Sequence, residues 1–206
     1  MRDRISCLGL TVTAALVLFA VVAGAAGAAA RSPGSASRAA GSETRTFPFR
    51  AAEVAPAEVC PGQAATGLSA EAGARVILCM TNYARQFNGL RPLTNSRPLG
   101  RAAEQRSADI LSCDEFSHEA CGRRFTFWAQ RFGYLKGCWR AGENIAWGTG
   151  EESTSGAIFV AWLESPEHHA NILGNYRETG IGERIGGLEG NEGAAVWTQD
   201  FGSHQC

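Results

Sequence analysis

The positions of apolar residues predict helices through the middle of the chain. One helix should begin after Ser69, a good N-cap residue, and end at Gly89. Its inner face repeats at helical spacing, at Val76, Met80, Tyr83, Ala84 and Phe87. A second helix should begin near Pro98, because the fixed φ of proline suits a first helical turn. Its inner face consists of Leu99, Ala102, Ala103 and Ile110.

Shorter helices are predicted in the second half of the chain. One runs through the aromatic positions Phe125, Trp128 and Phe132 and ends at Gly133. Residues 152–163 predict another, whose apolar positions are Ile158, Ala161 and Trp162. The pair Ser165–Pro166 then predicts an N-cap followed by proline at the first helical position, in a short helix closed by Gly174.

The last third of the chain changes from helical spacing to short, partly alternating segments. Residues 179–185 and 194–201 are bounded by glycines and predict two strands, joined by a turn around Gly190. Residues 143–147 predict a weaker strand or a loop. Helices first and paired strands last indicate the α+β class, with helices packed on an antiparallel sheet.

Residues 1–30 have the three parts of a secretory signal peptide. Arg2 and Arg4 provide the positive start, residues 8–22 the apolar middle, and Ala28–Ala30 the small-residue exit. A retained membrane anchor is the alternative, but the strongly apolar stretch is shorter than the ~20 residues that span a bilayer. We therefore expect cleavage near Ala30, a secreted, extracellular protein, and no transmembrane segment after cleavage.

Composition divides the rest of the chain into a spacer and a domain. Residues 31–56 are rich in Ala, Ser, Arg, Gly and Pro without sustained periodicity, which predicts a flexible spacer. Residues 57–206 suit one compact domain. The net charge of −1 and the lack of a basic run give no electrostatic footprint for nucleic acid, so we expect no nucleic-acid partner.

Cysteine usage points to an oxidising compartment. The chain has seven cysteines, and setting aside Cys7 within the signal peptide leaves six. An even number after a signal peptide indicates disulfides, and six cysteines allow fifteen connectivities. A metal cluster is the alternative, but the chain has no CxxC pair, which argues against a structural zinc site.

Histidines and a glutamate in marked local contexts are the candidates for chemistry. His118 ends the string F-S-H, and Glu143 lies in G-E-N-I-A. His168 lies in W-x-x-S-P-x-H-x-x-N, which begins at Trp162. The string G-Y precedes the second of these motifs, and W-T-Q-D-F-G at residues 197–202 follows the third.

In this order and at this spacing, the motifs resemble those of the CAP superfamily. That family includes cysteine-rich secretory proteins, insect venom antigen 5 and the plant pathogenesis-related proteins. The chain is most similar to the bacterial SCP-like extracellular branch, and the resemblance covers residues 72–202. It implies a three-layer α-β-α sandwich with a central antiparallel sheet and a central cleft.

The resemblance also implies which side chains line the cleft. CAP domains often place two histidines and two acidic residues there. His118 matches the first histidine, and Glu143 matches the glutamate of the G-E-N motif. His168 matches the second histidine of the bacterial pattern. The position of the second acidic residue has no direct match, and Glu164 or Glu167 could take its place.

Two imidazoles and a carboxylate support more than one chemistry. His118 and His168 could hold a divalent metal such as zinc with open positions, although no cofactor is required. With Glu143 they could equally act as acid and base. A structural role is also open, in which Glu143 caps backbone donors in a loop and His168 is hydrogen-bonded in the first turn of its helix.

The function predicted first is a secreted binding domain. It would take a small or lipid-like ligand, or a cell-envelope partner, at the cleft of His118, Glu143 and His168. Members of the family are linked to sterol and lipid binding, to proteolysis and to signalling, so the fold alone does not settle the activity. The alternatives are an extracellular metal-assisted hydrolase (a protease or esterase) and a structural surface protein with a vestigial cleft. The sequence offers no convincing nucleophile for the hydrolase.

Three disulfides are expected. Cys113–Cys121 pairs close neighbours in sequence and would hold the segment that contains His118. The resemblance favours Cys138–Cys206, because the family fold would bring the end of the last strand to the loop before Glu143. Cys60–Cys79 then remains, and would pin the end of the spacer to the first long helix.

Overall fold

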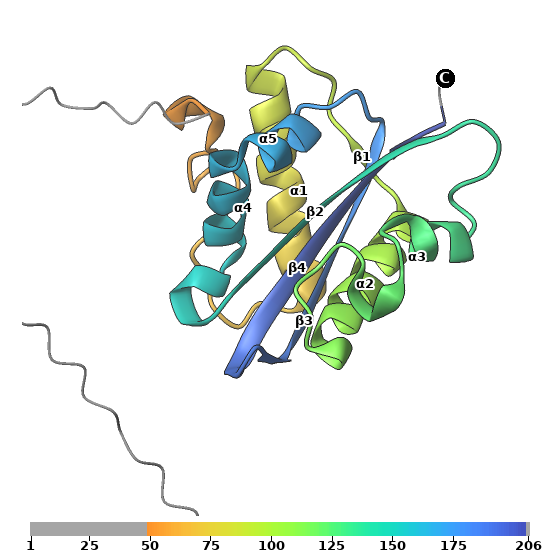
Figure 1. Ribbon diagram of the computed structural model, residues 1–206. Helices are drawn as coiled ribbons and strands as arrows, with labels where there is room; N and C mark the ends of the chain where they lie inside the picture. Colours follow the sequence, from red (N-terminus) through yellow and green to blue (C-terminus); the bar gives the residue numbers. More distant parts are fainter. Residues whose placement is uncertain (1–48, 205–206) are drawn as a thin grey trace, which may run out of the picture. The chain divides into compact units, whose positions relative to one another are not determined.

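The computed structural model describes residues 49–204. The predicted signal peptide, most of the predicted spacer and Cys206 lie outside the described residues. In the described part, a central sheet separates two groups of helices (Figure 1). The first face carries α1 (Ala70–Phe87), α4 (Ser155–Glu164) and α5 (Pro166–Ile172), and the opposite face carries α2 (Arg97–Cys113) and α3 (Thr126–Arg131). This is the predicted α-β-α sandwich.

The sheet has the strand order β1-β3-β4-β2. Its strands are β1 (Thr94–Asn95), β2 (Arg140–Gly148), β3 (Glu178–Leu188) and β4 (Asn191–Ser203). The pair β3–β4 is the predicted antiparallel hairpin, and β2, predicted as a weaker strand or a loop, is a strand that pairs antiparallel with β4. Strand β1 pairs with β3 in parallel. The sheet is therefore mixed at one edge. Strand β1 was not predicted, because two residues are too few to show an alternating pattern.

The two faces of β4 build two different layers. Trp197 and Phe201 face α1, α4 and α5, where they join the main apolar cluster. Val196 and Thr198 face α2: Val196 packs with Ile110, and the Thr198 hydroxyl lies 2.9 Å from that of Ser107. Because side chains alternate along a strand, Asp200 lies on the same face as Thr198, next to the candidate site.

Local signals place the helices close to their predicted positions. The Ser69 hydroxyl accepts a hydrogen bond from the Ala72 N–H at 3.2 Å and so caps α1. The helix predicted from residue 152 begins later, at Ser155, because a 3-10 turn, η3 (Gly150–Ser153), comes first. Thr154 then caps α4 by accepting from the Ala157 N–H at 3.3 Å.

Helix α2 lies unusually close to β3. A Cβ at Gly180 would overlap the backbone of Gly100, and a Cβ at Gly182 would overlap the backbone of Glu104. Glycine at these two strand positions therefore lets the helix backbone approach the sheet directly.

The packed domain begins before residue 57, the predicted boundary. Residues 51–53 form a 3-10 turn, η1 (Ala51–Glu53), and both Glu53 and Ala55 are 3% exposed. Phe49 and Val54 pack against the main apolar cluster. A three-residue turn has no periodicity for a sequence pattern to detect, so this end of the predicted spacer belongs to the packed domain.

Two of the expected disulfides are present. Cys60–Cys79 joins the segment before α1 to that helix, and Cys113–Cys121 joins the end of α2 to the 3-10 turn η2 (Ala120–Gly122). The third predicted pairing, Cys138–Cys206, involves a residue outside the described range. Among residues 49–204, no helix is long and apolar enough to cross a membrane.

Candidate functional site

The candidate site is centred on His118 and Glu143. His118 lies in the loop after α2, and Glu143 projects from β2 toward the α2 side of the sheet. The His118 Nδ1 lies 2.7 Å from the Glu143 Oε1. The histidine side chain is 48% exposed, whereas the glutamate side chain is 1% exposed. A buried carboxylate thus fixes the orientation of an imidazole that remains open to solvent.

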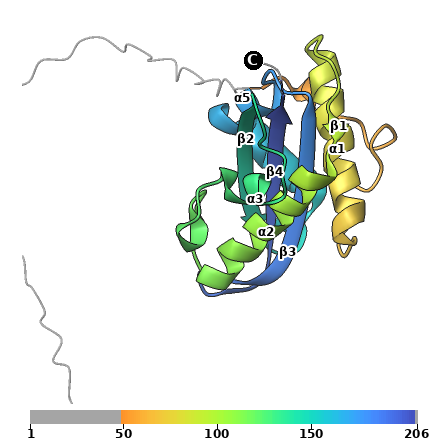
Figure 2. The same ribbon diagram turned by 90° about the vertical axis from the view of Figure 1, so that its right-hand side faces the viewer.

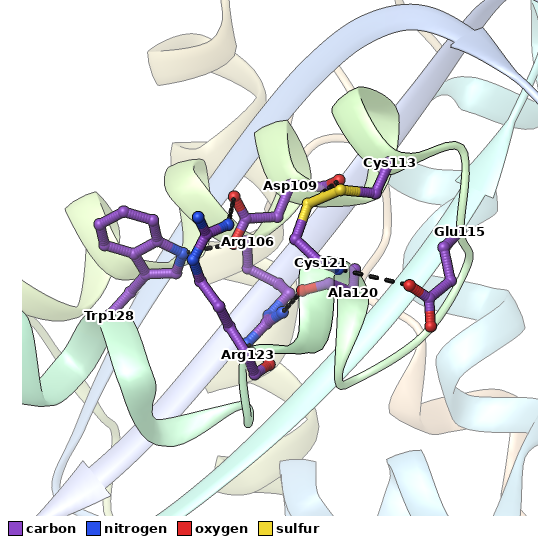
Figure 3. Close-up of a disulfide and its surroundings, with 8 residues drawn as sticks. All are labelled: Arg106, Asp109, Cys113, Glu115, Ala120, Cys121, Arg123 and Trp128. Carbon is purple, nitrogen blue, oxygen red and sulfur yellow. Dashed lines mark hydrogen bonds and ion pairs between the residues drawn. A yellow bond between two sulfur atoms is a disulfide. The ribbon is translucent and has the colours of Figure 1, made fainter.

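The loop that carries His118 is tied to α2 (Figure 3). The Cys113–Cys121 bridge closes the loop covalently. Arg106, which is 1% exposed, binds the far side of the loop. Its guanidinium donates to the backbone carbonyls of Ala120 at 3.3 Å and of Arg123 and Arg124 at 2.8 Å each.

Asp109 adds a second attachment one helical turn further along α2 (Figure 3). Its carboxylate accepts from the Trp128 Nε1–H at 2.7 Å and from the Arg123 Nη1 at 2.9 Å. Helix α3 and the turn before it are therefore held to α2 by charged side chains. This arrangement leaves the position of His118 little freedom.

Behind His118, two carboxyl groups share one buried cation. Glu143 and Asp200 are direct partners in the β2–β4 register, and Asp200 is 4% exposed. The Arg106 Nε lies 3.4 Å from the Glu143 Oε2. Burial raises the pKa of Glu143, and the contacts with His118 and Arg106 act against that rise. Burial and then the charge of Glu143 raise the pKa of Asp200 well above its ordinary value. Burial and mutual repulsion therefore both oppose full ionisation of the two carboxyl groups.

His168 approaches the same site from the opposite layer. It lies near the start of α5, and the Asn144 side chain donates to its backbone carbonyl at 3.1 Å. The Asn171 side chain donates to the Glu143 carbonyl at 3.2 Å and to the Asn144 Oδ1 at 2.9 Å. These bonds fasten α5 to β2 beside Glu143. Burial first, and the nearby His118 second, lower the pKa of His168.

The motifs that meet at this site match a known family along most of the domain. The model of the cysteine-rich secretory protein family, CAP, matches residues 78–201, more than half of the chain. The chain belongs to the CAP family. Within it, the F-S-H, G-E-N and S-P-x-H strings are brought together by the loop after α2, by β2 and by α5.

Several bacterial proteins are similar to this chain. Protein YkwD of Bacillus subtilis (strain 168) is 32% identical over 136 residues, which cover 65% of this chain and 48% of that protein. The chain thus spans about half the length of this relative. An extracellular SCP-domain protein of Bacillus anthracis str. Ames has a solved structure with a TM-score of 0.53 and 25% identity, covering 64% of this chain and 40% of that one. An outer surface protein of Borrelia burgdorferi shares the fold, with a TM-score of 0.53 and 16% identity over 65% of this chain and 93% of that one.

The remaining CAP-type residues are arranged less simply. Glu164, one of the two candidates for the second acidic residue, is exposed at the end of α4, and its side chain makes no hydrogen bond or ion pair with any described residue. Within residues 49–204, no group of three or more His, Cys, Asp or Glu side chains is arranged to hold the predicted zinc ion. The Glu143 oxygens already face His118 and Arg106. These donors therefore do not fit a three-ligand metal site.

A second histidine–glutamate pair was not predicted. The His169 Nε2 lies 2.7 Å from the Glu53 Oε2, and their side chains are 14% and 4% exposed. The pair joins α5 to η1 and so holds the start of the domain in place. Glu53 was assigned to the spacer, and no local pattern could pair it with a histidine more than a hundred residues away.

Two further residues of the site were missed, although the sequence carried a signal for each. Arg106 falls at helical spacing between Ala102 and Ile110, in the middle of the predicted apolar face of its helix. Asp200 falls within the apolar strand segment 194–201. An ionisable residue at a core position calls for a partner, and here the two residues lie beside the same glutamate.

Proposed function

We propose that this chain is a secreted binding domain whose ligand contacts the imidazole of His118. The observation that carries the proposal is the 2.7 Å contact between half-exposed His118 and fully buried Glu143. Burying a carboxylate is costly, and a histidine with only a structural role would be expected to be buried with it. An imidazole held by a buried group and open on its other side is suited to meet a ligand from solvent.

His168 is the second proposed contact. It is attached through Asn144 to the strand that carries Glu143, and its pKa responds to the charge of His118. The two imidazoles would offer a small molecule, or a polar group of a cell-envelope component, two hydrogen-bonding nitrogens. The extracellular placement is supported by the predicted signal peptide, by the disulfides and by bacterial relatives described as extracellular or outer surface proteins.

Native mass spectrometry of the chain secreted into growth medium tests the proposal. The wild-type protein is expected to retain a non-covalent ligand, and His118→Gln is expected to lose it. His169→Gln is the matched control, because its histidine–glutamate pair lies elsewhere, and it should keep the ligand. A run with chelator would show any retained metal. Equal retention by the wild type and His118→Gln would contradict the proposal.

The hydrolase remains the second candidate, favoured by the same contact. A carboxylate that orients an imidazole is the arrangement used for general-base catalysis. Incubation of the secreted chain with a pool of peptides and esters would distinguish the two functions. Turnover that disappears in His118→Gln would identify an enzyme, and its absence together with ligand retention would identify a binding domain.

A further inference from the structure

The edge of the sheet farthest from His118 has no strand partner along most of its length. Strand β3 is the edge strand except where β1 covers it, and β1 pairs only with Glu178 and Thr179. The strand continues through residues 180–188 beyond that pairing. At about 3.3 Å per residue, the uncovered edge is roughly 30 Å long. In the strand order β1-β3-β4-β2, the opposite edge of the sheet is β2, the strand that carries Glu143.

The uncovered backbone groups can be assigned from the β1 pairing. The Thr94 N–H donates to the Arg177 carbonyl at 3.0 Å, and the Ser96 N–H donates to the Thr179 carbonyl at 2.8 Å. The N–H and C=O of successive strand residues point alternately to the two sides. Ile181 and Glu183 therefore direct their backbone groups away from β4, past the end of β1, where the Glu183 carbonyl accepts from the Arg184 Nη1 at 3.3 Å and no strand pairs with either residue. Ser96 already occupies the N-cap position of α2, so β1 cannot extend to cover them.

The open edge forms the floor of a groove between α1 and α2. Figure 2 shows β3 flanked by these two helices. The groove has a volume of about 430 Å³, within the range of ligand pockets. Its floor includes Ile181 and Gly182, and Asn95 and Ser96 close the end next to β1. The groove thus continues the line of β1 along β3.

The charged side chains of the groove are mostly basic. Three exposed arginines line it: Arg75 on α1, and Arg97 and Arg101 on α2. The acidic residues are Glu71 and Glu104, and Glu104 is already paired with Arg184 at 3.3 Å. This leaves three arginines against one glutamate, in a chain whose net charge is −1.

We propose that this groove binds an extended acidic peptide segment of a partner protein, which adds to β3 as a further strand in line with β1. Backbone hydrogen bonds to Ile181 and Glu183 would supply the pairing, and the arginines of the two walls would select acidic side chains. The chain's own residues 31–48 are a poorer occupant, because they carry three arginines and one glutamate and would meet like charge. The site is separate from His118 and does not depend on its ligand.

Fluorescence anisotropy with labelled model peptides tests the proposal on the secreted chain. The probe is a short peptide of alternating Glu and Val, and its control alternates Lys and Val. The acidic peptide should bind at least tenfold more tightly than the basic one. The acidic peptide with N-methyl groups on its backbone nitrogens should lose at least tenfold, because it cannot donate to β3. Equal binding of either control would overturn the proposal.

Variants at Gly100 provide the matched test from the protein side. A Cβ at Gly100 would lie 4.0 Å from the Ile181 carbonyl oxygen, in open groove space. Gly100→Ala should therefore fold and bind the acidic peptide as the wild type does, whereas the larger side chain of Gly100→Leu should weaken binding at least tenfold. Arg75→Glu with Arg97→Glu should weaken it similarly without changing a buried residue. Unchanged binding in this double variant would overturn the proposal. Self-association by sedimentation that Gly100→Leu abolishes would also overturn it, by making the edge an interface between copies.

Discussion

Two histidine–glutamate pairs with the same 2.7 Å separation lie in different surroundings in this molecule. In the pair of His118 and Glu143, the imidazole is 48% exposed and only the carboxylate is buried. In the pair of His169 and Glu53, both side chains are largely buried, at 14% and 4% exposure. The first pair presents an imidazole to solvent, whereas the second connects two parts of the fold. The distance between two partners therefore says little about their role until the exposure of each is considered.

The groups behind each pair sharpen the contrast. Glu143 has Arg106 and Asp200 beside it, so its charge is part of a buried network. Glu53, which contacts His169, lies on η1, a short turn whose flanking residues Phe49 and Val54 pack against the main apolar cluster. Substitutions in the first network should therefore change both stability and the orientation of His118. Substitutions in the second should affect mainly the attachment of the start of the domain.

The largest effect is expected from Arg106→Met. The change removes the cation beside Glu143 and the donors to three loop carbonyls. Losing one partner of a buried ion pair costs about 3–5 kcal/mol of unfolding free energy. Urea denaturation followed by circular dichroism measures it. Arg101→Met, an exposed change on the same helix, should cost less than about 1 kcal/mol, and an equal loss in both variants would refute a special role for Arg106.

Replacing Glu143 alone, and then Glu143 together with Asp200, tests whether either carboxyl group can neutralise Arg106. In Glu143→Gln, Asp200 no longer meets the charge that helped to raise its pKa, so ionisation of Asp200 beside Arg106 becomes easier. The loss of unfolding free energy should then be only about 1–2 kcal/mol at pH 7. Glu143→Gln with Asp200→Asn leaves Arg106 without a counter-charge and should lose about 3 kcal/mol. If the losses of unfolding free energy in Glu143→Gln and Asp200→Asn add up, and Asp200→Asn alone causes a large loss, the two carboxyl groups do not substitute for each other beside Arg106.

The two histidines themselves should separate stability from binding. His169→Leu should lower the unfolding free energy by about 1–2 kcal/mol, because it leaves Glu53 buried without its partner. His118→Leu should lower it by less, under about 1 kcal/mol, because the imidazole is half exposed and Glu143 keeps Arg106 beside it. Hydrogen exchange should show faster exchange at residues 51–55 only in His169→Leu. The opposite ranking of the two variants would reverse the roles assigned to the pairs.

The smallest effect concerns Glu183, a largely buried carboxyl outside both pairs. Burial raises the pKa of Glu183 from 4.5 to about 7. The folded state therefore holds the proton more tightly than the unfolded chain, so this group's contribution to stability is full below pH 4.5 and is lost as pH rises through 7. Glu183→Gln should match the wild type near pH ~4 and exceed it by about 1 kcal/mol at pH ~8. Denaturation midpoints across this range measure the difference, and parallel curves for the two proteins would contradict it.

The helices could be predicted because their ends are fixed by local chemistry. Ser69 caps α1 through its own hydroxyl, and Pro98 lies in the first turn of α2, so neighbouring residues are enough to place them. Strand β1 could not be predicted in this way, because its existence depends on Thr94 and Asn95 meeting β3 more than eighty residues away. The order of elements is a local property, whereas strand partners are not.

The candidate site shows the same division. His118 and Glu143 could be named from family motifs, but their pairing needs the bend of the loop after α2. The link between Glu143 and Asp200 depends on the β2–β4 register, and a slip of one residue would send Asp200 to the other face of the sheet. Arg106 could have been singled out as a charge on an apolar helix face, whereas its partners could not.

Because of the bridge between Cys113 and Cys121, the redox conditions under which the protein is produced affect its site. It closes the short loop that presents His118, while the sheet and the main apolar cluster are built elsewhere in the chain. Protein made in a reducing cytoplasm would lack this bridge and still contain most of the groups that drive folding. Such a sample could pass a thermal melt or a gel-filtration run and nevertheless present the imidazole in several orientations. Thiol titration of each batch is therefore as important to a binding assay as its purity.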